Sequence, residues 1–325
     1  MRKSDIKKFL KKYDYGNLIN FELLKSHQNK VYKVTTDKGC YVIKEYSKDA
    51  IGNSNYLNTR DEQIRISKIL NDNGIDTVIP ISYKKRNFIL YKEHYYLVYN
   101  YMESRPKEKD EITIDNIRKL AFTQSKIHKL DIESSLGCSY KNIDMDIDNH
   151  LKKIYKIDGR LYEKLNTNKD ILNNIINNCN KYIDEMNNNL CISHNDYKLL
   201  NVLWKNEEMI LIDFDATGFS NPTCSLCESA FTFSNYGNYI NYDYYEEYLN
   251  TYIKEYGLIK DNYYKALYVS FNGKLQWLNY MFSKNHLKKN NYIDDCISMI
   301  DELVLYYNNI DRFNNMFAVV NSNLK

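Results

Sequence analysis

The stretch that decides the fold is His194-Asn195-Asp196-Tyr197-Lys198-Leu199-Leu200-Asn201, followed by Ile210-Leu211-Ile212-Asp213-Phe214-Asp215. An Asp and an Asn stand five residues apart here, and a second Asp ends an apolar run twelve residues after the Asn. Phosphoryl transfer needs such a set: one carboxylate faces the acceptor hydroxyl, and an amide plus a second carboxylate hold magnesium against nucleotide phosphates. A lone H-x-D arises often by chance, but H-x-D-x-x-x-x-N before an apolar strand that ends in Asp is much rarer.

Each polar residue of this stretch has an expected role. Asp196 is predicted to face the acceptor hydroxyl and to accept or orient its proton. Asn201 and Asp213 are predicted to be magnesium ligands, with Asp213 at the end of a buried strand. Lys198 is a candidate to stabilise the transferring charge, and a loop lysine that stays in water is an equal alternative. Asp215 either assists with metal or substrate or is structural.

Histidines and paired cysteines often bind metals, but here they are expected to be structural. His194 is predicted to brace the loop, and His128 to be a packing histidine on a helix. Cys224 and Cys227 form a C-x-x-C, but zinc would need a second ligand pair at matching spacing, and none follows.

A lysine in an apolar strand, Tyr41-Val42-Ile43-Lys44-Glu45-Tyr46, supplies the upstream part of the pattern. Burying Lys44 costs free energy unless an anion accepts its charge, so Lys44 is predicted to hold the nucleotide phosphates. Glu62 in the following helix is its predicted partner. Asp61 is the alternative, because one position turns a helix face by about 100°. A lysine on an edge strand that points to water is the remaining alternative.

The first hundred residues predict a small antiparallel β lobe with one inserted helix. A helical pattern over 4–13 comes first, and the inserted helix is expected over 57–71. Short β-branched or aromatic segments separated by polar turns predict about five or six strands. These strand segments are 19–24, 30–35, 40–46, 78–82, 88–91 and 95–101.

Beyond residue 112 the pattern is mainly helical, apart from a loop and two short strands, 202–204 and 209–214, within 190–214. The expected helices are 113–130, 146–158, 169–189, 223–233, 242–256, 261–284 and 290–309. This order predicts an α+β, bilobal fold of the protein-kinase type. The expected parts are a nucleotide-binding lobe (1–100), a hinge (101–106) and a helical lobe with the catalytic loop and substrate site (107–325).

Three further segments have expected places in the site. Ser26-His27-Gln28-Asn29-Lys30 is the predicted position of a phosphate-covering loop, although it has no glycine. Asn100 and Tyr101 begin the connection whose backbone is predicted to bind a purine base. The Tyr-rich stretch 236–256 is explained mostly by helical amphipathicity, and some of its acids and aromatic faces suit an acceptor pocket for a cationic substrate.

Composition narrows the class of protein. With 45 basic and 42 acidic side chains, the net charge of +3 does not indicate a nucleic-acid partner. No apolar run approaches the ~18–20 residues that span a bilayer, and the charged N-terminus lacks the apolar stretch of a secretory signal. The seven cysteines form an odd number in a chain too large to need disulfides, which predicts reduced thiols and a cytoplasmic location.

These residues resemble the aminoglycoside phosphotransferase and choline kinase superfamily of small-molecule kinases. The motifs that carry the resemblance are His194-x-Asp196-x-x-x-x-Asn201, Ile212-Asp213-Phe214-Asp215, Lys44 with Glu62, and Ile127-His128-Lys129-Leu130. The resemblance covers about residue 15 to about residue 285. Eukaryotic-type protein kinases are less similar, because Asp215 stands where they carry the glycine of D-F-G.

The sequence departs from the family pattern at two places. The family often has an Asp-Leu pair at the start of the helix after its metal motif, where the acid braces the catalytic loop. The corresponding pair after Pro222 looks like Ser225-Leu226. The nucleotide loop also lacks glycine.

The resemblance implies transfer from ATP, or alternatively GTP, to the hydroxyl of a small molecule, with Mg²⁺ required. An aminoglycoside-type or other amino-alcohol acceptor is expected. A choline- or ethanolamine-type kinase is the second hypothesis. The third is a non-catalytic, spore-coat-like protein with a kinase fold. Such a protein would have no physical need for Lys44, Asp196, Asn201 and Asp213. No motif specifies the acceptor or an oligomeric state.

Overall fold

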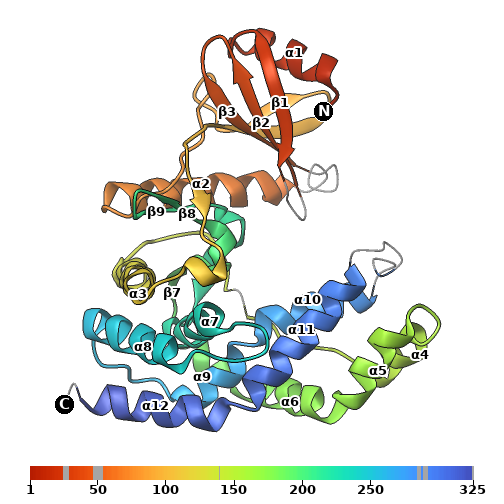
Figure 1. The fold of residues 1–325 in the computed structure, drawn as a ribbon, viewed down its shortest axis with the longest axis vertical. Helices are drawn as coiled ribbons and strands as arrows, with labels where there is room; N and C mark the ends of the chain where they lie inside the picture. Colours follow the sequence, from red (N-terminus) through yellow and green to blue (C-terminus); the bar gives the residue numbers. More distant parts are fainter. Residues whose placement is uncertain (25–28, 47–53, 139, 284–286, 288–291, 324–325) are drawn as a thin grey trace. The chain divides into compact units, whose positions relative to one another are not determined.

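The protein is described from a computed structural model, which covers residues 1–24, 29–46, 54–138, 140–283, 287 and 292–323. The chain forms two compact units, which are described in turn (Figure 1). The first contains Met1–Lys107, Ser134–Leu136 and Leu200–Asp215, and the second contains Glu108–Glu133, Gly137–Leu199 and Ala216–Lys325. An antiparallel N-terminal sheet precedes a mainly helical part, which confirms the α+β class.

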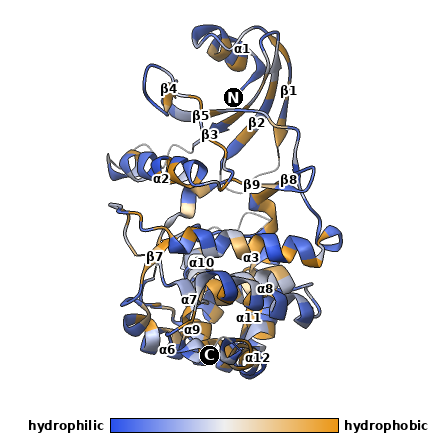
Figure 2. Ribbon diagram, turned by 90° about the vertical axis from the view of Figure 1, so that its left-hand side faces the viewer, coloured by the Kyte–Doolittle hydropathy of each residue, from blue (hydrophilic) through white to orange (hydrophobic). Residues whose placement is uncertain are grey.

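The first unit is built on a five-stranded antiparallel sheet of order β1-β2-β3-β5-β4. Its strands are β1 (Leu18–Leu24), β2 (Lys30–Thr36), β3 (Cys40–Glu45), β4 (Ile89–Tyr91) and β5 (His94–Asn100). Hydrophilic and hydrophobic residues both occur along these strands, as different environments on the two faces require (Figure 2). Helix α1 (Lys3–Lys12) adds Ile6, Phe9 and Leu10 to the core on one face.

The register of the sheet directs Lys44 away from the α1 core. Lys44 lies opposite Val31 on β2 and Leu97 on β5, whereas the alternate residue Ile43 belongs to the core with α1. Helix α2 (Ser54–Asp72) packs on the other face, where its Ile64 joins Leu97. Lys44 therefore shares the face of the sheet that α2 covers.

A second, three-stranded sheet completes the first unit, in the order β6-β8-β9. Its strands are β6 (Arg105–Pro106), β8 (Val202–Lys205) and β9 (Glu208–Leu211). Asn206 and Glu207 have φ angles of 47° and 65°, so two left-handed residues make the tight turn between β8 and β9. The strand predicted over 209–214 is too long, because its pairing with β8 ends at Leu211.

The strand predicted over 78–82 is wrong. This segment makes only scattered bonds: Val78 N donates to Leu211 O at 3.3 Å, and Ile81 N donates to Val98 O at 2.7 Å. Pro80 has no backbone N–H and interrupts any continuous ladder.

The second unit consists of helices around a small two-stranded pairing of β7 (Cys191–Ser193) with β10 (Gly218–Ser220). Its first helices are α3 (Ile114–Lys129), α4 (Ile147–Ile154), α5 (Gly159–Thr167) and α6 (Lys169–Met186). They are followed by α7 (Pro222–Ser234), α8 (Tyr242–Tyr256), α9 (Tyr263–Val269), α10 (Asn272–Ser283), α11 (Tyr292–Tyr307) and α12 (Ile310–Ser322). Across the two units, short 3-10 helices cover Lys109–Glu111, Leu199–Asn201 and Phe214–Ala216.

The predicted helix over 261–284 is two helices, and its last residue lies outside the described part of the chain. The break comes at Ser270, whose hydroxyl donates to the Leu267 carbonyl, and at Asn272, whose side chain binds the backbone of Lys141. Polar side chains that bind nearby backbone compete with helix continuation. The helix predicted over 290–309 is α11, whose described residues begin at Tyr292.

The tyrosines of α8 form core rather than a pocket. Tyr245, Tyr248 and Tyr252 are fully buried, and their hydroxyls bond to Tyr263, Gln124 and His128. Amphipathic packing thus explains these three residues, as expected for most of the stretch. Within the described residues, no helix combines the length and apolar character needed to cross a membrane.

Candidate active site

Lys44 is held between two carboxylates in the first unit. Its Nζ lies 2.8 Å from Asp213 Oδ1 and 2.7 Å from Asp215 Oδ2, and its side chain is 11% exposed. Burial alone would lower the pKa of Lys44, but the negative charges of Asp215 and then Asp213 more than offset it, so the pKa is raised. The ammonium group is therefore charged.

Backbone geometry sets the position of Asp213. Strand β9 ends at Leu211, whose N–H donates to Asp76 O at 2.8 Å, and Ile212 N donates to Asn201 O at 3.0 Å. Asp213 itself has a φ of 64°, in the left-handed region that Asp tolerates better than most side chains. Asp213 thus lies two residues beyond the end of β9, the strand that was predicted to include it.

Asp215 has more polar partners than the sequence indicated. Besides Lys44, its carboxylate accepts a hydrogen bond from the Tyr46 hydroxyl at 3.1 Å and lies 3.4 Å from Arg60 Nη1. Asn29 Nδ2 lies 3.5 Å from Asp215 Oδ2. Asp215 therefore ties the segment after β9 to strand β3 and helix α2.

The structure does not bring Glu62 to Lys44. Glu62 accepts hydrogen bonds from Arg65 at 2.7 Å and from Ser134 at 2.6 Å, and the bond from Arg65 contributes most to lowering its pKa to about 2. The alternative, Asp61, accepts from Asn87 at 3.0 Å. The expected pair fails because the face of α2 that reaches the Asp215 segment carries Arg60 and Gln63. One position of sequence separates Gln63 from Glu62 and turns the face by about 100°.

Asn201 and Asp213 are suitable magnesium ligands in chemical type. Asn201 is buried, and its backbone is joined to Ile212, next to Asp213. Amide and carboxylate oxygens are the hard donors that Mg²⁺ prefers, usually one or two per protein, with phosphates and water completing its shell. Across the described residues, no group of three or more His, Cys, Asp and Glu side chains is arranged to hold a metal ion. The donor set therefore fits a metal bound together with a nucleotide better than a metal held by protein alone.

The loop after β7, in the second unit, carries Asp196 and Lys198. Lys198 Nζ lies 2.7 Å from Asp196 Oδ1, and the two side chains are 43% and 35% exposed. The structure thus brings these two predicted residues together where solvent and a substrate can reach them.

Two residues beside Asp196 hold this loop, and no role was predicted for either of them from the sequence. Asn195 has a φ of 58°, and its Nδ2 donates to the carbonyls of Ala216 and Gly218 at 3.3 Å each. The buried Tyr197 donates its hydroxyl to Leu120 O at 3.0 Å. An Asn between His and Asp was the available signal, because Asn adopts the left-handed region readily.

The two histidines near this loop are buried, as expected for structural residues. The ring of His194 lies 6.0 Å from that of Tyr197. His128 Nδ1 lies 2.7 Å from the Tyr252 hydroxyl, and its Nε2 lies 2.9 Å from the hydroxyl of Ser193, the residue before His194. Burial lowers the pKa of His128 to about 3, so the ring is neutral.

Helix α7 begins next to the same loop, at the position where the family often carries an acid. Ser225 Oγ lies 2.8 Å from Ser220 Oγ and 3.4 Å from Ser193 Oγ, so a chain of hydroxyls replaces a carboxylate. Cys224 and Cys227 on this helix are buried free thiols, and burial raises the pKa of both.

Asn100 and Tyr101 lie at the end of β5. Asn100 pairs with Tyr41, and Tyr101 N donates to Cys40 O at 2.9 Å. Lys33 Nζ lies 4.1 Å from the centre of the Tyr101 ring. Most of the predicted phosphate-covering loop, 26–30, lies outside the described residues.

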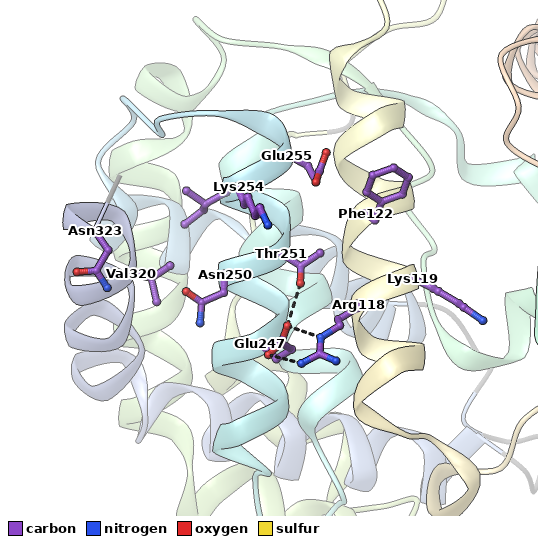
Figure 3. Close-up of a pocket in the computed structure, with 11 residues that line it drawn as sticks. Arg118, Lys119, Phe122, Glu247, Asn250, Thr251, Lys254, Glu255, Val320 and Asn323 are labelled. Carbon is purple, nitrogen blue, oxygen red and sulfur yellow. Dashed lines mark hydrogen bonds and ion pairs between the residues drawn. The ribbon is translucent and has the colours of Figure 1, made fainter. Parts of the chain in front are cut away.

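A surface groove of about 630 Å³ lies between α3, α8 and the end of α12 in the second unit (Figure 3). Two of its charged residues pair with each other: Arg118 Nε lies 2.8 Å from Glu247 Oε1, which also accepts from Thr251 at 3.1 Å. None of the loop residues 194–198 lines it. This groove is therefore separate from the residues that the motifs single out.

Comparisons with known proteins place the chain in a family. The model of the phosphotransferase enzyme family matches residues 21–264. A comparison with curated proteins gives no match.

Solved structures share the fold at low sequence identity. A spectinomycin phosphotransferase in complex with ADP and spectinomycin matches with a TM-score of 0.70 and 14% identity, over 94% of this chain and 98% of that one. An amicoumacin kinase in complex with AMP-PNP and Ca²⁺ has a TM-score of 0.64 and 14% identity, over 96% of each chain. A choline kinase from Streptococcus pneumoniae has a TM-score of 0.58 and 16% identity, over 95% of this chain and 97% of that one.

The solved structures confirm the predicted kinase-like fold. The family match confirms the predicted superfamily. Since the family model spans most of the sequence, the chain belongs to the phosphotransferase enzyme family and is a phosphotransferase.

Proposed function

We propose that this enzyme transfers the γ-phosphoryl group of ATP, or alternatively GTP, to a hydroxyl of a small molecule. The observation that carries the proposal is the buried Lys44 bound by Asp213 and Asp215, which stand 169 and 171 residues away in the chain. A charged lysine next to acidic side chains on a turn is what a nucleotide triphosphate and its metal require. The relatives that contain ADP or AMP-PNP support nucleotide use.

In the proposed mechanism, the first unit binds the donor. Lys44 exchanges its carboxylate partners for the non-transferred phosphates. Asp213 and Asn201 would then hold magnesium, which neutralises charge on the phosphate oxygens. The backbone at Asn100 and Tyr101 binds the base. Glu62 has no nucleotide role in this proposal, because Arg65 and Ser134 occupy its carboxylate.

In the proposed mechanism, the loop after β7 binds and orients the acceptor. Asp196 accepts a hydrogen bond from the attacking hydroxyl and orients its oxygen in line with the γ-phosphorus. Lys198, which is paired with Asp196 in the structure, moves toward the transferring group and stabilises its charge. Asn195 and Tyr197 keep the loop in place between these steps.

An amino-alcohol antibiotic of the aminoglycoside type is the proposed acceptor. The spectinomycin and amicoumacin enzymes have TM-scores of 0.70 and 0.64 with this chain. Choline is the second candidate, because a choline kinase matches over 97% of its own length. The seven free thiols agree with the predicted cytoplasmic location, where the donor is available.

Release of ADP or GDP in a coupled assay tests the proposal. Each nucleotide is combined with spectinomycin, a panel of aminoglycosides, choline and ethanolamine, with and without Mg²⁺. The expected result is turnover that requires both Mg²⁺ and one acceptor class. Absence of turnover with every acceptor, together with absence of Mg²⁺-dependent nucleotide binding, would contradict a catalytic function.

A further inference from the structure

Helix α2 reaches the segment after β9 through two donor side chains. Arg60 Nη1 and Gln63 Nε2 both donate to the backbone carbonyl of Asp215, the latter at 3.0 Å. Arg60 Nη1 also donates to Gln63 Oε1 at 2.7 Å and lies 3.4 Å from Asp215 Oδ1. Asp215 is thus held through both its main-chain carbonyl and its side-chain carboxylate. Figures 1 and 2 both show α2 beside the β8–β9 hairpin that leads into this segment.

The spacing of the two donors places them on one face of the helix. Positions 60 and 63 are three residues apart, and side chains at this spacing are neighbours on a helix. Glu62 lies on a different face and binds Arg65. Arg60 is only 17% exposed on its side chain, and Gln63 is buried, so both donors are fixed by packing.

The charges in this cluster are balanced. Lys44 and Arg60 supply two positive charges, and Asp213 and Asp215 supply two negative charges. When Lys44 turns to bind phosphates, Asp215 loses one cationic partner. Arg60 remains beside it and prevents a partly buried carboxylate from being left without compensation.

We propose that Arg60 and Gln63 are positioning residues that fix the segment carrying the metal ligand Asp213. This inference rests on the proposed function. Asp215 is two residues from Asp213, and Asp213 has a φ of 64°. The direction of the Asp213 side chain therefore depends on how the backbone is held on both sides of it. Ile212 is fixed by its bond to Asn201, and the two donors of α2 fix the other side. Helix α2 is therefore coupled, through Asp215, to the segment that carries the proposed metal ligand.

Arg60 also has contacts that would matter in a purely structural role. Its guanidinium carbon lies 4.8 Å from the centre of the Tyr56 ring. Loss of that packing lowers stability but does not change how much Mg²⁺ the nucleotide requires. Metal dependence therefore separates positioning from packing.

The test uses Arg60→Met, which keeps an unbranched apolar side chain and removes the charge and the donors. Calorimetry measures binding of AMP-PNP over a series of Mg²⁺ concentrations, and steady-state kinetics measure kcat and KM. The concentration of Mg²⁺ for half-maximal AMP-PNP binding is expected to rise about 10-fold or more, and kcat to fall about 10–100-fold, as is usual when a residue that supports a metal ligand is lost. Arg60→Lys should raise the Mg²⁺ requirement less than Arg60→Met does. Gln63→Leu, a milder change, should also raise the Mg²⁺ requirement by a smaller factor.

Arg65→Gln is the matched control, because it removes an arginine of the same helix that binds Glu62 instead. It is expected to leave the Mg²⁺ requirement unchanged. A folded Arg60→Met or Gln63→Leu variant with an unchanged Mg²⁺ requirement would overturn the inference alone. If the wild-type enzyme binds AMP-PNP without regard to Mg²⁺, the proposed function fails and the inference fails with it.

Discussion

At the residue scale, Asp196 and Lys44 lie in different environments. Asp196 is paired with Lys198 on a partly exposed loop, whereas Lys44 is buried between two acids. An exposed carboxylate suits contact with an acceptor, and a buried cation suits a polyanionic donor. The two residues should therefore affect different kinetic constants.

Replacing Asp196 should remove chemistry without removing donor binding. Asp196→Ala is expected to lower kcat by about 10²–10⁴-fold, because the acceptor hydroxyl loses its orienting group. The Kd for AMP-PNP, measured by calorimetry, should change little. A variant with full activity would exclude Asp196 from this role.

His128 should make stability depend on pH. Burial lowers its pKa to about 3 in the folded enzyme, against about 6.5 in an unfolded chain. The folded state therefore excludes a proton that the unfolded state binds, so its contribution to stability is present above pH 6.5 and is lost as the pH falls toward 3. Between pH 7 and pH 5 the loss amounts to about 2 kcal/mol.

Denaturant unfolding at both pH values checks this prediction. The variant His128→Asn should be less stable at pH 7, and its stability should fall by about 2 kcal/mol less than that of the wild type on going to pH 5. Equal losses in the two proteins would show that His128 does not exclude the proton.

Residues with a fixed local spacing could be located from the sequence, and helix-facing residues could not. Asp196, Asn201 and Asp213 follow one another on a short stretch, so their pattern is visible in one dimension. The choice of Glu62 depended on the rotation of α2, which is set by packing of Ile64 on Leu97 and not by spacing. For the same reason, the sequence alone did not indicate a role for Arg60.

At the element scale, breaks and joins were harder to predict than the elements themselves. The sequence predicted α8 over its full length and the strands β1, β2 and β3 to within a residue or two. Helix α5 was missed, although Asp158 caps it by accepting from Leu161 N at 3.0 Å. Caps of this kind are short-range signals that also occur in turns, so they indicate a helix start only in context.

Helices α7, α10 and α11 share a charged cluster away from the motifs. Lys274 Nζ lies 3.2 Å from Glu228 Oε1 and 3.5 Å from Glu302 Oε1, beside a small internal cavity lined by Phe231, Phe271 and Tyr306. Lys274→Met should destabilise the enzyme by roughly 1–3 kcal/mol, because two partly buried carboxylates lose their cation.

Chemical denaturation of the variant measures this effect. The double variant Lys274→Met with Glu228→Gln should recover part of the loss, since one uncompensated charge is removed with its partner. A single variant as stable as the wild type would show that the cluster is solvated and adds nothing.

At the scale of the whole molecule, the order of strands and helices was predictable but long-range joining was not. Alternating short strands and then a run of helices indicates an α+β chain from pattern alone. The joining of Leu200–Asp215 to the first unit depends on pairings such as Arg105 with Trp204 and Thr77 with Leu211. Such contacts involve residues far apart in the chain, and no local pattern encodes them.

Lys44 and Asp213 are proposed to serve one Mg²⁺–nucleotide site. The most direct measurement is AMP-PNP binding by calorimetry, with and without Mg²⁺, for the wild type, Lys44→Met, Asp213→Asn and the double variant. We expect Mg²⁺-dependent binding by the wild type and an affinity loss of about 10-fold or more in each single variant. The loss of binding free energy in the double variant should be smaller than the sum of the two single losses. Binding that is unchanged in both single variants would contradict the account.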